Sequence, residues 1–327
     1  MAELKYIDGL REALHEEMER DSNVIALGED VAAGGAFGVT QGLVEAFGAR
    51  RVINTPISED TIMGFAVGCA IAGKRPIIEI MFMDFMTLAM SQLVNHAAKL
   101  HYMSGGQLSV PMVIRVQQGA VGAWGAHHSQ SLEAWFAHVP GLKLVAPATP
   151  GDAKGLLKAS IRDNDPVIFI EHRGLYFKGE GVVDGAEVAL GEARVAREGT
   201  DITIATYSKM LWEALDAAEV LAGQGISAEV VDLRSIVPLD LDTIVDSVKK
   251  TNRLVIAHEA VMQGGVGAEI AAQIQRSAFD WLDAPIERVG APFSPVPASP
   301  GLEQAFLPGK ADIVTAVQTV LGANGQQ

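Results

Sequence analysis

The chain has 327 residues, more than the roughly 250 to 300 that one hydrophobic core usually supports, so its length predicts two domains. Hydrophobic residues make up 49% of it and charged residues 20%, which excludes a disordered chain and predicts well-filled cores. The net charge of −15 argues against nucleic acid or an anionic membrane surface as a partner. A single cysteine, Cys69, excludes a disulfide framework and a multi-thiolate metal site.

The N-terminal region predicts neither secretion nor membrane insertion. Met1 is followed within a few residues by an amphipathic helical pattern over 6–21, with no secretory signal before it. The longest apolar stretch, 62–73, is shorter than the roughly 20 residues that a bilayer requires. With its lone cysteine, the chain is therefore expected to be cytoplasmic.

Strand and helix patterns alternate through the first half of the chain. Apolar runs predict strands at 24–28, 51–55, 76–80, 110–117, 142–146 and 166–171. Helical patterns are expected at 41–47, 58–72, 84–100 and 129–137 and from 149 onward, with Ser58 and Asp84 as caps and Gly73 as a stop. Repeated strand-then-helix steps predict an α/β fold with a doubly wound parallel sheet.

A glycine-rich and charged segment interrupts this alternation after the sixth strand. We expect a first domain over 1–177, a connection over 178–199, a smaller α/β domain over 200–321 and a frayed tail over 322–327. In the second domain the patterns predict strands at 201–207, 228–232, 254–258 and 286–289, and helices at 209–221, 242–249 and 267–279.

Three turns in the first half carry side chains that a turn does not need. The turns at 57–60, 81–85 and 127–130 each follow a predicted strand. Ligands in open parallel sheets bind beyond the carboxyl ends of the strands, so these turns predict one shared active-site crevice. Taken singly, Glu59 could be a helix-dipole carboxylate, Phe85 a core residue and His128 a turn histidine.

Two glycine motifs resemble nucleotide-binding loops but fail in detail. Gly68–Arg75 matches most of a phosphate-binding loop, but Arg75 stands where Ser or Thr must contact magnesium, and a helix precedes the motif where a strand is required. The Gly265-Val266-Gly267 segment begins a dinucleotide fingerprint, but Ile270 replaces the third glycine. A helix end and a tight turn explain these two segments better.

Several longer motifs stand in the order found in one known family. They are Gly28-Glu29-Asp30, Asn54-Thr55-Pro56-Ile57-Ser58-Glu59, His128-Ser129-Gln130-Ser131, Pro140-Gly141-Leu142-Lys143, Asp152-Ala153-Lys154-Gly155-Leu156-Leu157, Ile161-Arg162-Asp163-Asn164-Asp165-Pro166 and Val231-Asp232-Leu233-Arg234. Together they resemble the β subunit of the thiamine-diphosphate-dependent E1 component of 2-oxo acid dehydrogenase complexes. The resemblance implies a transketolase-like fold, with a pyrimidine-binding domain followed by a transketolase C-terminal domain.

The resemblance also implies roles for the turn residues. Glu59 would hydrogen-bond N1′ of the cofactor aminopyrimidine, whose own imino group then removes the thiazolium C2 proton. Phe85 and Met81 would form an apolar wall against the pyrimidine ring. His128 would line the substrate and lipoyl channel and assist acyl transfer. Since His127 is adjacent, that assignment depends on the Ser129-Gln130 that follows.

Metal ions and partners are implied in the same way. Family members often hold potassium with backbone carbonyls, and the matching positions are Met112, Ser160, Ile161, Asp163 and Asp165. An ordinary solvated Asp-Asn-Asp turn is the alternative. The family binds Mg²⁺ and the diphosphate with a Gly-Asp-Gly motif that this chain lacks, which implies an E1 α subunit in an α2β2 heterotetramer. The C-terminal domain would dock the basic subunit-binding domain of the E2 lipoyl acyltransferase.

The expected function is decarboxylation of a 2-oxo acid, with transfer of the acyl group to lipoyl-E2. Pyruvate is the favoured substrate, with acetoin or a branched-chain 2-oxo acid as alternatives. A nicotinamide-dependent oxidoreductase is a more remote alternative, disfavoured by the broken glycine fingerprint, and a non-catalytic scaffolding subunit is a third. The sequence does not identify the substrate, because much of that pocket would belong to the α subunit.

Overall fold

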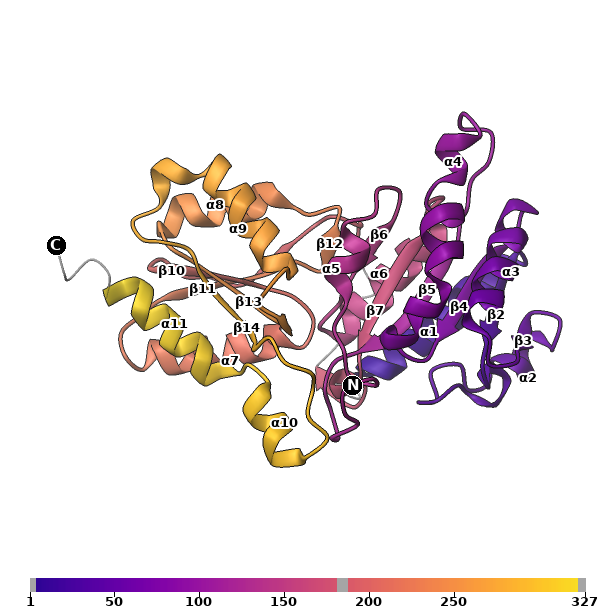
Figure 1. Ribbon diagram of the computed structural model, residues 1–327, viewed down its shortest axis with the longest axis horizontal. Helices are drawn as coiled ribbons and strands as arrows, with labels where there is room; N and C mark the ends of the chain where they lie inside the picture. Colours follow the sequence, from indigo (N-terminus) through magenta and orange to yellow (C-terminus); the bar gives the residue numbers. More distant parts are fainter. Residues whose placement is uncertain (1–3, 181–187, 323–327) are drawn as a thin grey trace. The chain divides into compact units, whose positions relative to one another are not determined.

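The computed structural model describes residues 4–180 and 188–322, and the chain divides into two compact units (Figure 1). The first unit contains Met1–Gln118 and Trp135–Leu190, and the second contains Gly119–Ala134 and Gly191–Gln327. The middle of the predicted connection, 181–187, and most of the predicted tail, 323–327, lie outside the described residues.

The first unit is built on a parallel sheet. Its strands lie side by side in the order β6-β7-β5-β4-β2-β3. They are β2 (Val24–Gly28), β3 (Val52–Asn54), β4 (Arg75–Ile80), β5 (Val113–Gln118), β6 (Lys143–Val145) and β7 (Val167–His172), and a separate antiparallel pair joins β1 (Leu4–Lys5) to β8 (Gly179–Glu180). Every residue of β2, β5 and β7 is buried, as expected for strands covered on both faces.

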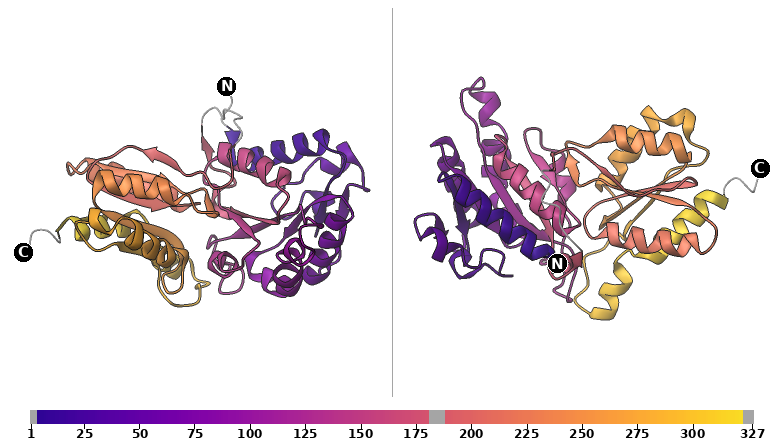
Figure 2. Two further views of the ribbon diagram at one scale, coloured as in Figure 1. Left: turned by 90° about the horizontal axis from the view of Figure 1, so that it is seen from above. Right: turned by 180° about the vertical axis from the view of Figure 1, so that it is seen from behind.

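Helices cover both faces of this sheet. The helices in this part of the chain are α1 (Tyr6–Arg20), α2 (Leu43–Phe47), α3 (Glu59–Ile71), α4 (Leu100–Met103), α5 (Glu133–Ala137) and α6 (Pro150–Arg162), with shorter 3₁₀ turns η1 (Val31–Ala33) and η4 (Arg173–Leu175). The left panel of Figure 2 shows the indigo α1 and the pink α6 on one side of the sheet and the purple helices on the other. The start of α6 follows from its sequence, because the Thr149 side chain accepts a hydrogen bond from the backbone N–H of Asp152 and Pro150 begins the helix.

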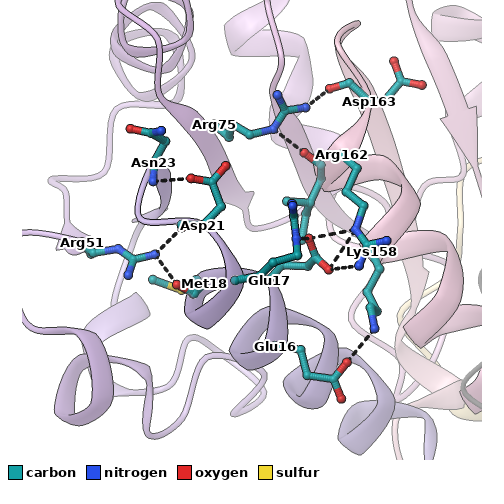
Figure 3. Close-up of polar contacts among 12 residues, drawn as sticks. Glu16, Glu17, Met18, Asp21, Asn23, Arg51, Arg75, Lys158, Arg162 and Asp163 are labelled. Atoms are coloured by element: carbon teal, nitrogen blue, oxygen red, sulfur yellow. Dashed lines mark hydrogen bonds and ion pairs between the residues drawn. The ribbon is translucent and has the colours of Figure 1, made fainter.

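Ion pairs join α1 to α6 along one side of the first unit. Lys158 contacts Glu16 at 2.7 Å, and Arg162 contacts Glu17 at 2.7 Å (Figure 3). Burial alone would raise the pKa of Glu17, but the hydrogen bonds from Arg162 and Arg20 outweigh it and lower the pKa. These ion pairs therefore fix how α1 and α6 lie against each other.

A charged cluster lies inside the first unit, between three neighbouring strands. The guanidinium of Arg115 on β5 donates to Glu171 on β7 at 2.6 and 2.9 Å and to Glu79 on β4 at 2.8 Å. The Tyr176 hydroxyl donates to Glu171 at 2.6 Å, and Gln117 donates to Glu79 at 3.2 Å. Burial alone would lower the pKa of Arg115, but the charges of Glu171 and Glu79 raise it, so the arginine stays ionised. All three charged side chains are at least 98% buried.

The second unit is a smaller α/β layer structure. Its strands lie in the order β14-β13-β10-β11-β9, of which β9 alone is antiparallel to its neighbour. The strands of this sheet are β9 (Arg194–Arg197), β10 (Ile202–Thr206), β11 (Ala228–Asp232), β13 (Leu254–Val261) and β14 (Glu287–Ala291), and the short strand β12 (Ser235–Val237) is not part of it. The helices are α7 (Met210–Ala222), α8 (Leu241–Thr251), α9 (Val266–Ser277), η5 (Phe279–Trp281), α10 (Pro300–Phe306) and α11 (Lys310–Gly322). Figure 1 shows α8 and α9 on one face of this sheet and α7 and α11 on the other.

The predicted α/β fold with a parallel first sheet is confirmed, and so are most strands of both units. The structure adds features that the sequence did not predict. Strand β9 lies inside the segment expected to be a connection, because its short Arg-Val-Ala-Arg sequence is that of a partly exposed edge strand. Two helices, α10 and α11, follow the last predicted strand.

The predicted helix over 84–100 is wrong in its first part. The structure has a 3₁₀ helix, η2 (Met83–Ala89), and then a π-helix, η3 (Ser91–Ala97). A 3₁₀ turn places residues i and i+3 on one line, so Met83 and Met86 are buried while Leu88 is 59% exposed. Asp84 is likewise not the cap, because the cap position is Phe82.

We predict that replacing the buried arginine destabilises the chain far more than replacing an exposed one. Arg115→Leu leaves Glu79 and Glu171 buried without their cation, which costs about 3 to 5 kcal/mol of unfolding free energy. Arg50→Leu, at an exposed position, should change it by less than about 0.5 kcal/mol. Denaturant unfolding followed by circular dichroism measures both, and equal values for the two variants would contradict the importance of the cluster.

Candidate active site

Glu59 is the first residue of α3, at the carboxyl edge of the first sheet. It follows β3 and the turn Thr55–Ser58, and only 7% of its surface is exposed. Ser58 occupies the cap position, but its hydroxyl donates to Thr61 Oγ1 at 2.9 Å and not to the helix backbone. Within the part of the chain that the structure describes, the Glu59 carboxylate has no hydrogen-bond partner. A nearly buried carboxylate of this kind is available for a ligand.

Other acidic residues gather around Glu59 at the ends of β2 and β4. Burial raises the pKa of Glu29, and the charges of Glu59, Asp30 and Glu79 raise it further. The turns after β2 and β3 are joined directly, since Thr55 N donates to Gly28 O at 3.0 Å and Asn54 Oδ1 accepts from Ala32 N at 2.8 Å. The sequence did not assign a role to Glu29, although the motif that contains it was noticed.

The turn after β4 carries Met81 and Phe85, both partly exposed. Phe85 N donates to Phe82 O at 2.9 Å, which closes the turn. The Phe82 ring lies 6.0 Å from the Phe37 ring and 5.0 Å from the guanidinium of Arg173. The turn therefore packs against Phe37 and the guanidinium of Arg173 through the Phe82 ring. The sequence did not single out Phe37 or Arg173.

The histidine pair belongs to the second unit. His127 Nδ1 and His128 Nδ1 are 2.8 Å apart, and the two rings meet edge to face. One ring nitrogen must donate and the other accept, so the tautomers of the two side chains depend on each other. Because Glu59 and Phe85 belong to the first unit, the predicted meeting of all three turns in one crevice stays a prediction.

The segment that carries the histidines also lines a pocket of about 430 Å³ inside the second unit. Its walls come from the histidine segment, from the end of β13 and from the segment after β14. The lining residues include Ser129, Gln130, Glu259, Phe293, Val296 and Phe306.

Several of the carbonyl groups expected to bind potassium already accept hydrogen bonds. Arg75 donates through Nε to Ile161 O at 2.7 Å and through its terminal nitrogen to Asp163 O (Figure 3). Met112 O accepts from Val167 N at 2.9 Å, as in an ordinary sheet. Lys143 contacts the carboxylates of Asp163 and Asp165 at 2.7 and 3.0 Å. A potassium ion would have to share this turn with two cationic side chains.

Comparisons with known proteins agree with this architecture. Residues 2–178 match the transketolase pyrimidine-binding domain, and residues 191–313 match the transketolase C-terminal domain. A pyruvate dehydrogenase E1 component subunit beta from Rickettsia felis is 50% identical over 96% of this chain and 97% of its own length. The chain belongs to the E1 β subunit family of 2-oxo acid dehydrogenases.

Other relatives of this E1 β subunit are named as subunits of enzymes that act on different substrates. Subunit beta-2 of mitochondrial pyruvate dehydrogenase E1 from Oryza sativa is 47% identical over 97% of this chain and 86% of its own length. The β subunit of acetoin:2,6-dichlorophenolindophenol oxidoreductase from Cupriavidus necator is 46% identical over 95% of this chain and 96% of its own length. A solved structure, "Split gene transketolase, inactive beta4 tetramer", matches with a TM-score of 0.82 and 24% identity over 97% of this chain and 98% of its own, which confirms the fold.

These matches confirm the predicted family membership, fold and enzyme class. The family is thiamine-diphosphate dependent. The roles of individual residues stay predictions. Among residues 4–180 and 188–322, no helix is long and apolar enough to cross a membrane. In that same part of the chain, no group of three or more histidine, cysteine or acidic side chains is arranged to hold a metal ion.

Proposed function

We propose that this E1 β subunit, together with an α subunit, decarboxylates pyruvate and transfers the acetyl group to the lipoyl group of E2. Relatives from Rickettsia felis and Oryza sativa, named as pyruvate dehydrogenase subunits, favour pyruvate. The Cupriavidus necator relative makes acetoin the second candidate. A cytoplasmic location stays a prediction from the single cysteine.

The observation that carries this proposal is the position of Glu59. Its carboxylate is nearly buried, starts a helix at the carboxyl edge of a parallel sheet, and has no partner among the described residues. That environment fits an aminopyrimidine nitrogen, because the group can accept or share one proton there. Met81 and Phe85, partly exposed at the next turn, would cover the flat apolar ring.

Thiamine diphosphate, when bound, supplies the nucleophile and electron sink for decarboxylation. Glu59 would hydrogen-bond N1′ of the aminopyrimidine and share a proton with it, which would favour the ring form that can act as a base. His128, through a ring nitrogen, would assist proton transfer during acyl transfer. The contact from His127 fixes which nitrogen of His128 faces away.

An α subunit would complete the site. The carboxylates near Glu59 repel a diphosphate, so the diphosphate and its Mg²⁺ would be held by a partner that carries Gly-Asp-Gly. The surface of α3 supports a partner, since Phe65 is 53% exposed, Ile71 is 41% exposed, and nothing lies within 4 Å of a side chain added at Gly68. We propose an α2β2 heterotetramer in which such apolar surfaces are covered.

We predict that Glu59→Gln keeps the fold but removes most activity. Glutamine has the same shape, yet it cannot share a proton with N1′, and loss of such acid-base help typically costs about 10²- to 10⁴-fold. The matched control is Asp60→Asn, which removes an exposed charge from the same helical turn. Steady-state decarboxylation by the assembled enzyme measures both variants. Near-wild-type turnover of Glu59→Gln would show that Glu59 does not have the proposed role at N1′.

We predict that the chain alone binds thiamine diphosphate weakly and catalyses nothing. Co-expression with an α subunit that carries Gly-Asp-Gly should give a heterotetramer whose cofactor binding requires Mg²⁺. Calorimetry on the chain and on the pair tests binding, and assays with pyruvate, 3-methyl-2-oxobutanoate and acetoin rank the substrates. Tight binding and turnover by the chain alone would overturn the two-subunit proposal.

We also propose that potassium binds the carbonyls of Met112, Ser160, Ile161, Asp163 and Asp165, in competition with Arg75. Potassium, but not sodium at equal ionic strength, should then raise the unfolding temperature, because a ligand that binds only the folded state stabilises it. Arg75→Met should enlarge this difference by freeing two carbonyls. Identical unfolding curves in both salts, for both proteins, would leave the ordinary turn as the better explanation.

A further inference from the structure

We propose that two buried carboxylates of the second unit, Glu259 and Glu303, are positioning residues for His128. They hold the backbone of the histidine loop, defined here as residues 119–134, by accepting its N–H groups. This inference rests on the proposed role of His128 in acyl transfer and extends it. It assigns to the C-terminal unit a part in catalysis beyond that of a docking domain.

The histidine loop needs such support because its own sequence does not fix its path. Residues 119–132 contain no helix or strand. Gly119, Gly122 and Gly125 have φ angles of 90°, 83° and 83°, and Ala123, which has a side chain, has φ of 58°. A left-handed conformation costs a residue such as alanine roughly 1 to 2 kcal/mol, so surrounding contacts must maintain it.

The two carboxylates accept hydrogen bonds from backbone N–H groups on either side of Gly122. Glu259 Oε1 accepts from Ala120 N at 2.8 Å, and Glu303 Oε2 accepts from Ala123 N at 2.8 Å. Glu259 is 8% exposed and Glu303 7% exposed. Hydrogen bonds to an ionised acceptor are roughly twice as strong as neutral ones, and burial strengthens them further. The second of them holds the strained Ala123 directly.

A third contact fixes the far end of the loop. Glu133 Oε1 accepts from the Tyr207 hydroxyl at 2.7 Å. Burial raises the pKa of Tyr207, and so does the nearby charge of Glu133, so the hydroxyl remains a donor. Glu259 also lines the 430 Å³ pocket together with Ser129 and Gln130, the two residues directly after His128. The loop is thus held at two points before the histidine pair and at one point after it.

The supporting groups come from regular elements of the second unit. Glu259 is on β13, Glu303 is on α10, and Tyr207 directly follows β10. A misplacement of about 1 Å in a catalytic group can cost about 100-fold in rate. Loss of the loop contacts should therefore slow the step that needs His128 more than the step that needs Glu59, which lies in the other unit.

The first test measures the loop in the full chain, without any activity. In Glu303→Ala, amide hydrogen exchange of peptides covering residues 119–134 should become about tenfold faster, because each lost charge-assisted bond changes the opening equilibrium by about that factor. Glu303→Gln keeps an accepting oxygen and should stay within about threefold of wild type. Glu269→Ala, which removes an exposed carboxylate of α9 that accepts a hydrogen bond from Gln273, is the control and should change nothing. Unchanged exchange in Glu303→Ala would overturn the proposal.

The second test uses the enzyme assembled with its α subunit and has His128→Ala as its reference. Lipoyl acylation and decarboxylation with an artificial electron acceptor are measured for each variant. His128→Ala, Glu303→Ala and Glu259→Ala should each lose several times more acylation than decarboxylation, mainly in kcat, and Glu303→Gln should recover most of the loss. If His128→Ala lacks this bias, the proposed role of His128 is wrong. If only the glutamate variants lack it, Glu259 and Glu303 are merely structural.

Discussion

The position of the candidate site depends on one buried arrangement, the Arg115 guanidinium between Glu79 and Glu171. These three residues come from adjacent strands, and a slip of any strand by one residue would turn its charged side chain to the opposite face of the sheet. The cost of a buried unpaired charge therefore fixes the register of β4, β5 and β7. Since the turn with Met81 begins directly after β4, the same cluster sets where that turn emerges.

The acidic edge of the first sheet explains why such a site would be divided between two chains. Burial raises the pKa of Glu29, and Glu59, Asp30 and Glu79 lie close enough for their charges to raise it further. This field favours a protonated ring nitrogen and disfavours a diphosphate. The same acidic surface cannot bind both the basic aminopyrimidine and the strongly anionic diphosphate of the cofactor. A β subunit specialised for the aminopyrimidine thus fits a partner specialised for the metal and the diphosphate.

The sequence predicted those features that depend on local chemistry. The alternation of apolar strands and helices, the Thr149 cap and the helix end at Gly73 all follow from neighbouring residues. Features that depend on distant contacts were missed. Glu79 and Arg115 stand in apolar strands and reveal no pairing until the strands are adjacent. The helix predicted over 84–100 begins instead as the 3₁₀ helix η2, which local sequence did not indicate. The motif alone led to the prediction for Glu59, which stays a prediction, whereas its acidic neighbours became visible only in the fold.

The histidine loop shows how a position can be fixed while its side chains remain free to differ. Glu259 and Glu303 accept hydrogen bonds from backbone N–H groups, which every residue except proline supplies. A change at Trp124 or His127 would therefore leave these contacts in place, although it would alter what surrounds His128. If the loop were instead held by its own side chains, each such change would also move the histidine. With backbone contacts to Glu259 and Glu303, the placement of residues 120–123 is a property of β13 and α10, and the chemistry at the site is a property of the loop side chains.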